Sequence, residues 1–358
     1  MSPQYRSKRT SALLFMIVLP FLFITHLHAG AGKNNNLQKS TFKPKPIYQK
    51  SEQFATRNND LQNFHWMKTD TTLELFNREN TVWKFNFKNI GKPYFYPLNT
   101  ADGVPLTWNS PPDHPWHHAL WFSWKKINGI NYWEENRETG LAEGITQVTG
   151  SKIFPGKNHS ARIELSISYH PPGKTTVLFE KRIINTSAPD KSGNYYIDWQ
   201  STFTAGDEKV GLERTPIEGQ KGGRRWGGYA TLACRIDTRS LKEIRFLDSE
   251  GRIDLDIHTK PAHWVDVSGV VASDTTKAAG ITIFDHKNNP RHPPPGYVIK
   301  DWVEDYQLLF AYMNPGFLYK NGLDLQAKES FTLAYRVFIH AGRGDLAQLE
   351  KAFIEWIK

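Results

Sequence analysis

The residues best suited to chemistry are concentrated between Ser110 and Trp124. This stretch holds one carboxylate, three histidines and three tryptophans: Asp113, His114, His117, His118, Trp116, Trp121 and Trp124. Imidazole groups transfer protons near neutral pH, and aromatic rings combine a large apolar face with a polar edge. The combination indicates acid–base chemistry on a polyhydroxylated ligand.

The backbone expected for this stretch decides which of its side chains face a ligand. Prolines at 111, 112 and 115 fix φ and predict a stiff, non-helical loop, and the residues after them predict a strand. Side chains alternate between the two faces of a strand. Alternation predicts one core face and one ligand face: Trp116, His118, Leu120, Phe122 and Trp124 on the first, and His117, Ala119, Trp121 and Ser123 on the second. We therefore interpret His118 as a core residue and predict that His114 and His117 are catalytic, with Asp113, Trp116 and Trp121 binding substrate.

A second proline-stiffened loop, residues 285–295, repeats this character. It carries Asp285, His286, Arg291 and His292. We expect the two loops to converge on one pocket, with Asp285 and His286 catalytic and Arg291 and His292 contacting substrate, because stiff loops lose little entropy on binding.

Two further stretches complete the predicted site. The glycine-rich residues 219–223 lead into Arg225, which can hold a carboxylate or sulfate, and into Tyr229, a second candidate substrate contact. Glu304 is a candidate catalytic base beside Asp285, and Glu213 is an alternative.

The elements that must position these residues are almost entirely β. Alternating or clustered β-formers between turn residues predict strands at 73–76, 82–87, 161–167, 176–179, 195–203, 228–236, 253–257, 279–284, 307–312 and 331–339. A helix is expected only at the end, capped by Asp345 and running to Ile357. The pattern shows no repeat and no internal linker, and it favours an all-β fold: one large two-sheet β-sandwich, a galactose-mutarotase-like supersandwich, spanning residues 61–358 with a short C-terminal helix.

The first sixty residues differ from this pattern. Basic residues precede an apolar run and a small-residue cleavage site, so residues 1–31 are predicted to be a signal peptide and the protein to be secreted or periplasmic. Residues 32–60 are predicted to be a disordered basic linker. The chain carries a net charge of +9, of which +3 falls in 1–31 and +4 in 32–60, which leaves +2 for the domain. This weak charge argues against nucleic-acid binding, and a single cysteine, Cys234, excludes an intrachain disulfide.

Several motifs resemble a bacterial family of unknown function whose members are often labelled "methane oxygenase PmoA". The resemblance lies in residues 92–98, 103–107, 110–118 and 227–229, in Asn128-Gly129 with Trp133, and in Asp285-His286 with residues 289–292. It implies a soluble β-sandwich associated with carbohydrate degradation. No apolar run of membrane-spanning length follows residue 31, as an oxygenase of the membrane would require.

Three functions remain open at this point. The first is a secreted enzyme that cleaves a glycosidic bond or moves a proton at a sugar ring, by analogy with mutarotases. The second is a carbohydrate-binding module without turnover. The third is a metal enzyme using His114, His117, His286, His292 and Asp113, although adjacent His117 and His118 cannot both face one metal on a regular strand. We predict no resident metal, leave the cofactor open, and expect a carbohydrate ligand and no membrane span.

Overall fold

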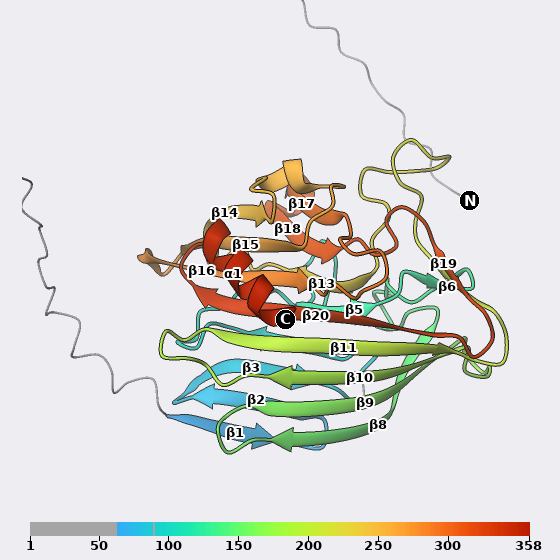
Figure 1. Ribbon diagram of the computed structural model, residues 1–358, viewed down its shortest axis with the longest axis horizontal. Coiled ribbons are helices and arrows are strands. Elements are labelled where there is room, and N and C mark those ends of the chain that lie inside the picture. The colour runs from blue at the N-terminus through green and yellow to red at the C-terminus, as the bar shows by residue number, and fades with distance from the viewer. Residues whose placement is uncertain (1–62, 89) are drawn as a thin grey trace, which may run out of the picture. The chain divides into compact units, whose positions relative to one another are not determined.

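Two eight-stranded antiparallel sheets make up most of the computed structural model, which describes residues 63–88 and 90–358 (Figure 1). The first, which we call the site sheet, has the order β1 (Phe64–Lys68), β2 (Thr72–Asn77), β3 (Asn80–Asn86), β4 (Tyr94–Leu98), β5 (Leu120–Ser123), β13 (Thr231–Arg235), β18 (Leu308–Pro315) and β17 (Gly296–Val303). The second, the back sheet, has the order β14 (Leu241–Asp248), β15 (Trp264–Val271), β16 (Asp274–Asp285), β20 (Ser330–Ala341), β11 (Tyr195–Ala205), β10 (Leu178–Thr186), β9 (Ala161–His170) and β8 (Ile145–Pro155).

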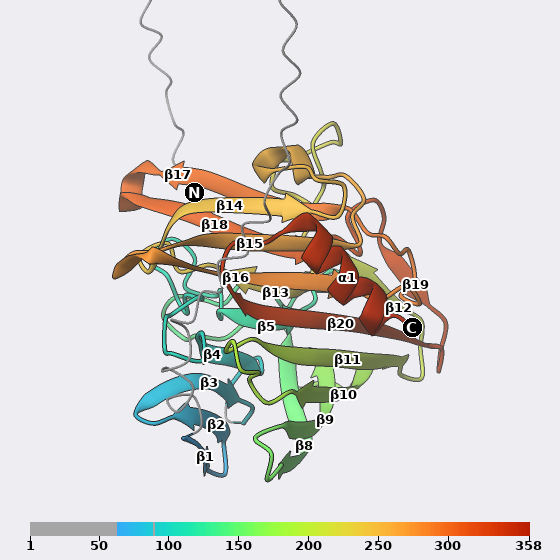
Figure 2. The ribbon, with the colours of Figure 1, turned by 60° about the vertical axis from the view of Figure 1, so that its left-hand side comes forward.

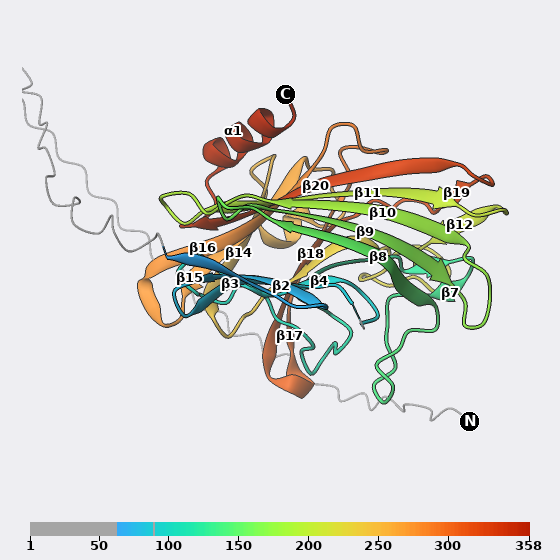
Figure 3. The same cartoon turned by 90° about the horizontal axis from the view of Figure 1, so that it is seen from below.

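Smaller elements lie around these two sheets. A four-stranded sheet contains β19 (Leu323–Leu325), β12 (Val210–Glu213), β6 (Lys126–Ile127) and β7 (Ile130–Asn131). Two 3-10 turns, η1 (Asp254–Ile257) and η2 (Glu304–Tyr306), flank the site sheet strands, and one helix, α1 (Leu346–Trp356), ends the chain. Figures 2 and 3 show α1 on the outer side of the back sheet.

The main hydrophobic core lies between the two sheets because their strands alternate. In the site sheet, Leu120, Phe122 and Met313 point into this core, and in the back sheet Trp199 and Val337 do so. Burial of each such side chain contributes about 1.5 to 3 kcal/mol. The fold therefore rests on inward faces of two patterned sheets, and the outward faces remain available for other roles.

The outward face of the site sheet is also aromatic, which is unusual for a solvent-facing surface. A second buried cluster there includes Trp121, Trp133, Tyr297, Phe310 and Tyr312. The register pairs Trp121 with Ala233 and Phe122 with Leu232, so adjacent residues of β5 supply opposite faces of the sheet. This second cluster forms the base on which the candidate site is built.

The structure confirms the two-sheet all-β fold with a C-terminal helix. Asp345 caps α1 by accepting a hydrogen bond from the amide of Gln348 at 3.0 Å. One expected strand is wrong: residues 253–257 form η1 rather than a strand. The predicted signal peptide at 1–31 and the predicted linker at 32–60 lie outside the described residues, and the domain boundary at residue 61 stays a prediction. Within the described part of the chain, no helix is long and apolar enough to cross a membrane.

Candidate functional site

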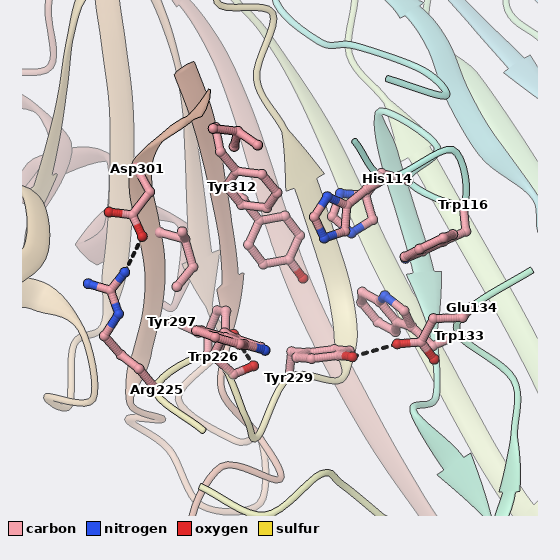
Figure 4. A pocket seen from close by; sticks show the side chains of 14 residues that line it. His114, Trp116, Trp133, Glu134, Arg225, Trp226, Tyr229, Tyr297, Asp301 and Tyr312 are labelled. Carbon is pink, nitrogen blue, oxygen red and sulfur yellow. Dashed lines mark hydrogen bonds and ion pairs between the residues drawn. The ribbon is translucent and has the colours of Figure 1, made fainter. Parts of the chain in front are cut away.

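A pocket of about 480 Å³ opens on the outward face of the site sheet (Figure 4). We call it the site pocket. Its lining comes from four parts of the chain: the loop before β5 (His114, Trp116, His117), the turn after β7 (Trp133, Glu134), the loop before β13 (Arg225, Trp226, Tyr229) and alternate residues of β17 and β18 (Tyr297, Ile299, Asp301, Val303, Phe310, Tyr312). Aromatic side chains dominate this lining, and a few polar groups converge on it, as is common for ligand pockets.

His114 stands on the pocket wall in a fixed orientation. Its Nδ1 donates to Asp113 Oδ2 at 2.9 Å, and Asp113 in turn accepts two hydrogen bonds from Arg235 Nη2, at 3.0 and 2.9 Å. Asp113 and Arg235 are almost completely buried, whereas the His114 ring is 37 % exposed. Because Nδ1 is occupied, the His114 ring has Nε2 left for a ligand.

The charges behind His114 are stabilised by each other. Burial by itself would raise the pKa of Asp113, but the hydrogen bond from His114 and the charge of Arg235 offset this, and the net pKa lies below its usual value. Burial lowers the pKa of Arg235 to about 10, and because this value is still well above 7, the guanidinium stays charged at neutral pH. Asp113 therefore orients the catalytic candidate from behind and does not itself reach the pocket.

His117 lies deeper in the same wall and has a different character. Its ring is stacked on His114, with 4.7 Å between centroids, and packs beside Trp121 and Tyr312. Its Nδ1 is buried without a hydrogen-bond partner in the described structure. Burial, followed by the charges of His114 and Arg235, lowers the pKa of His117 well below its ordinary value. His117 is thus a neutral imidazole in the pocket wall rather than a proton donor.

Glu134 supplies a carboxylate to the pocket that sequence reasoning missed. The hydroxyl of Tyr229 donates to Glu134 Oε1 at 2.5 Å, and Lys125 pairs with the other oxygen. Asn131 Oδ1 accepts the amides of Trp133 and Glu134, at 3.0 and 3.3 Å, and so fixes the turn that presents both residues. The sequence signal was the aromatic pair Tyr132-Trp133 directly before two glutamates.

The rim of the pocket opposite His114 carries a different pair of charges. Arg225 and Asp301 form an ion pair there, and Figure 4 shows it across the pocket from His114. Both side chains are more than 40 % exposed, so this pair contributes only about 0.2 to 1 kcal/mol to stability. The neighbouring Trp226 is 56 % exposed, and its carbonyl accepts a hydrogen bond from the Tyr297 hydroxyl at 2.6 Å. The rim therefore presents an indole and a paired, nearly neutral set of charges.

The structure brings together only part of the predicted site. His114, His117, Trp116, Arg225 and Tyr229 line the site pocket. Asp113 lies behind His114, and the expectation of an exposed indole at Trp121 is wrong, because Trp121 is fully buried against His117.

The predicted face assignment fails at the start of the strand. Strand β5 begins only at Leu120, and Ala119 has a φ of 64°, so alternation does not extend back to Trp116. Trp116 consequently lines the pocket instead of the core. His118 is mostly buried, as predicted, but among polar groups: its ring nitrogens lie 3.1 Å from Asn109 Oδ1 and 3.0 Å from Glu135.

The predicted convergence of the two proline-stiffened loops is wrong. None of Asp285, His286, Arg291 and His292 lines the site pocket. Asp285 ends β16, a strand of the back sheet, and its Oδ2 accepts from His292 Nδ1 at 2.6 Å, while burial raises the pKa of Asp285. Arg291 donates hydrogen bonds to the carbonyls of Phe317, Asn321 and Gly322, so it connects its own loop to residues 317–322.

The proposed bases elsewhere are also outside the pocket. Glu304 is exposed in η2, and Glu213 accepts a hydrogen bond from the amide of Gly129 at 2.6 Å. Neither lines the site pocket. Glu304 directly follows Val303, which lines the pocket, but it lies in the exposed turn η2, and Glu213 ends β12 in the separate four-stranded sheet.

The described residues offer no preformed metal centre: within 63–88 and 90–358 no three His, Cys, Asp or Glu side chains are grouped as metal ligands. His114 has Asp113 on Nδ1, and His117 is enclosed by aromatic rings. The pocket lining offers an oriented imidazole, a carboxylate and an aromatic surface.

Solved structures with a similar arrangement belong to several enzymes. An α-galactosidase from Lactobacillus brevis shares 11 % identity, with 80 % of this chain and 40 % of that chain covered and a TM-score of 0.38. A putative aldose 1-epimerase from Klebsiella pneumoniae shares 11 % identity over 80 % of each chain, with a TM-score of 0.36. A heparan sulfate lyase from Pedobacter heparinus shares 8 % identity, with 80 % of this chain and 36 % of that chain covered and a TM-score of 0.29. The chain thus spans about two fifths of the α-galactosidase that it matches.

The sequence itself gives one assignment. No curated protein sequence matches it. The resemblance described above is confirmed only at the level of a family without an assigned activity, and the oxygenase label gains no support. Residues 72–354 match the family of unknown function DUF6807, and the chain belongs to this family.

Proposed function

We propose that the site pocket binds a reducing sugar and interconverts its anomers, with His114 and Glu134 as the acid–base pair: one group takes the proton of the anomeric hydroxyl, the other gives a proton to the ring oxygen, and the bond between C1 and the ring oxygen opens and then closes again. The observation that carries this proposal is the orientation of His114 by the buried Asp113 and Arg235 inside an aromatic pocket. A buried ion pair beside an exposed imidazole stabilises one ring orientation and one tautomer, which a purely structural histidine does not need.

The shape and polarity of the pocket support a sugar as the ligand. Trp116, Trp226 and Tyr229 offer aromatic surface, and His114, Glu134 and the Arg225–Asp301 pair offer hydrogen-bond donors and acceptors at intervals between the rings. A sugar presents apolar C–H faces and a rim of hydroxyls, so it matches a lining that alternates in this way.

The polar groups favour proton transfer between the anomeric hydroxyl and the ring oxygen over two-carboxylate glycoside cleavage. Most glycosidases place two free carboxyl groups on either side of the scissile bond. In this pocket one carboxylate, Asp301, is neutralised by Arg225, and the other, Glu134, is held by Tyr229 and Lys125. One oriented imidazole and one carboxylate are the minimum needed for a general acid and a general base.

The test is interconversion of the α and β anomers of a panel of reducing sugars, measured by NMR magnetisation exchange and polarimetry, with hydrolysis of oligosaccharides measured in parallel. We expect His114→Ala and Glu134→Gln to lower turnover by about 100-fold or more while binding persists. His65→Ala, an exposed histidine of β1, is the matched control and keeps full activity. Sugar binding with no exchange and no cleavage would reduce the protein to a binding module, and absence of binding to every sugar would refute the proposal.

Action outside the cytoplasm is part of the proposal and depends on residues 1–31, which lie outside the described residues. Intact-mass measurement of the exported protein is expected to find an N-terminus near Gly30 or Gly32. Full-length protein confined to the cytoplasm would contradict export.

A further inference from the structure

A second polar cavity lies on the outward face of the back sheet, beside α1. It has a volume of about 380 Å³, and we call it the helix-side pocket. The residues that matter for its chemistry are Asp198, Gln200, His286, Asn288, Thr332 and Trp356. Figure 3 shows the two sheets as opposite layers, with α1 on the outer side of the back sheet. Since the main core lies between the sheets, the residues that line this pocket and those that line the site pocket belong to opposite outward faces of the sandwich.

The floor of the helix-side pocket follows from strand alternation in β11. Tyr195, Ile197, Trp199 and Phe203 are buried in the main core, whereas Asp198 and Gln200 point outward. Asp198 is opposite Arg336 of β20, which donates to both of its oxygens at 2.5 and 2.7 Å. The floor therefore carries a carboxylate whose charge is already balanced, next to the exposed amide of Gln200.

One wall of the pocket is aromatic. Trp356, in the last turn of α1, lines the pocket with its indole, and the guanidinium of Arg336 lies 5.4 Å from its ring centroid. His286 meets the same indole edge to face at 4.9 Å. These contacts fix the position of the ring at the edge of the cavity.

The other wall is the proline-stiffened loop after β16, which is fastened to the back sheet. Asn289 Nδ2 donates to Asp285 Oδ1 and to the Ala334 carbonyl, both at 2.8 Å, and Asn289 Oδ1 accepts the Ala334 amide at 2.7 Å. Asp285 and Asn289 are thus positioning residues, and the side chains that they present to the cavity are His286 and Asn288.

The tautomer of His286 follows from its local contacts. The amide of Asn288 donates to His286 Nδ1 at 3.2 Å, so Nδ1 is the acceptor and Nε2 carries the hydrogen. The pocket wall therefore offers an N–H donor here, together with the amide of Asn288, which donates and accepts. Such a mixed set of donors and acceptors suits hydroxyl groups, which do both.

We infer that the helix-side pocket is a second, non-catalytic binding site for a neutral polysaccharide chain. An indole, amide side chains and an N–H donor, held by the contacts described above, match a sugar ring with its hydroxyl rim. The balanced Asp198–Arg336 pair leaves no unpaired charge to attract an anionic polymer. The site anchors a chain on the face opposite the site pocket, and it does not depend on what reaction the site pocket performs.

The test is electrophoretic retardation of the full protein in gels containing soluble glucan, xylan, galactomannan or arabinogalactan, with polygalacturonate and heparin as charged comparisons. We expect at least one neutral polymer to retard the protein. Trp356→Ala is expected to weaken this retardation about fivefold or more, because it removes the aromatic surface. Trp356 also packs on Phe284, so the double variant Gln200→Ala/Asn288→Ala, with two exposed side chains, provides a second test with little risk to the fold.

The controls separate this site from the site pocket. His114→Ala/Trp116→Ala alters only the site pocket and is expected to keep the retardation, and Gln326→Ala, an exposed glutamine that lines neither pocket, is expected to behave as wild type. The inference is overturned by three outcomes: no neutral polymer retards the protein, only charged polymers do so, or retardation survives Gln200→Ala/Asn288→Ala and is lost in His114→Ala/Trp116→Ala.

Discussion

The ion pair behind His114 yields the most demanding prediction. Asp113 and Arg235 are buried to within 2 % of their side-chain surface. The Nε and Nη1 atoms of Arg235 have no partner in the described structure, and its Nη2 donates to both oxygens of Asp113. The guanidinium also lies over the ring of Phe310, at 3.8 Å from the ring centroid. Asp113→Leu leaves a buried, uncompensated cation and is expected to lower the free energy of unfolding by about 3 to 5 kcal/mol.

The double variant separates stability from function. Asp113→Leu/Arg235→Met replaces both charges with apolar groups, and such a replacement of a buried pair is often neutral for stability. The double-mutant cycle is therefore expected to show a coupling of about 3 kcal/mol or more between the two positions, because the double variant avoids the loss expected for Asp113→Leu alone. Urea denaturation followed by tryptophan fluorescence measures all four proteins.

Function follows the hydrogen bond to His114 rather than stability. The double variant regains a stable fold but has no acceptor for His114 Nδ1, so the rate of anomer interconversion is expected to stay about 100-fold below wild type. Nitrogen-15 NMR of the His114 ring reports the same change without any substrate, as loss of the single Nδ1–H tautomer. Additive stability effects, or a wild-type His114 spectrum in the double variant, would refute the assignment of Asp113 as the residue that orients His114.

Three other outcomes test the surroundings of the site pocket. The pKa of His117 is lowered from an ordinary value of 6.5, so below pH 6.5 the unfolded state binds a proton that the folded state does not. The free energy of unfolding therefore decreases as the pH is lowered, by up to about 1.4 kcal/mol per pH unit. His117→Asn is expected to make this slope shallower in denaturation series between pH 7.5 and 5. Gly227→Ala places a Cβ 2.0 Å from the Pro216 carbonyl and is expected to displace the Arg225–Trp226 rim and weaken sugar affinity in calorimetry, whereas Gly150→Ala, which meets only ordinary contacts, is not. His118→Ala removes a hydrogen-bond partner of Glu135 at 3.0 Å and is expected to cost about 1 to 3 kcal/mol, more than His114→Ala, and equal melting temperatures for the two variants would contradict this ranking.

Local patterns in the sequence determined much of the fold. Alternation in residues 195–203 and 331–339 gave two neighbouring strands of the back sheet, and Asp345 marked the start of the helix. These features depend on side chains within one element, and their period can be counted along the chain. The same holds for the stiff loop before β5, whose prolines restrict the backbone whatever surrounds it.

Only the tertiary structure decided which of these elements share a site. The orientation of His114 depends on an ion pair between Asp113 and Arg235, which are separated by 122 residues. Glu134 is held at the pocket by a hydrogen bond from Tyr229, which lies shortly before β13 in the sequence. The loop at 285–292 has the same local chemistry as the loop at 113–118, but β16 belongs to the back sheet, and the main core lies between the two. Strand order is set by long-range pairing, and the free energy of that pairing is spread over both sheets. The local composition of a stretch therefore does not determine on which face of the fold it will lie.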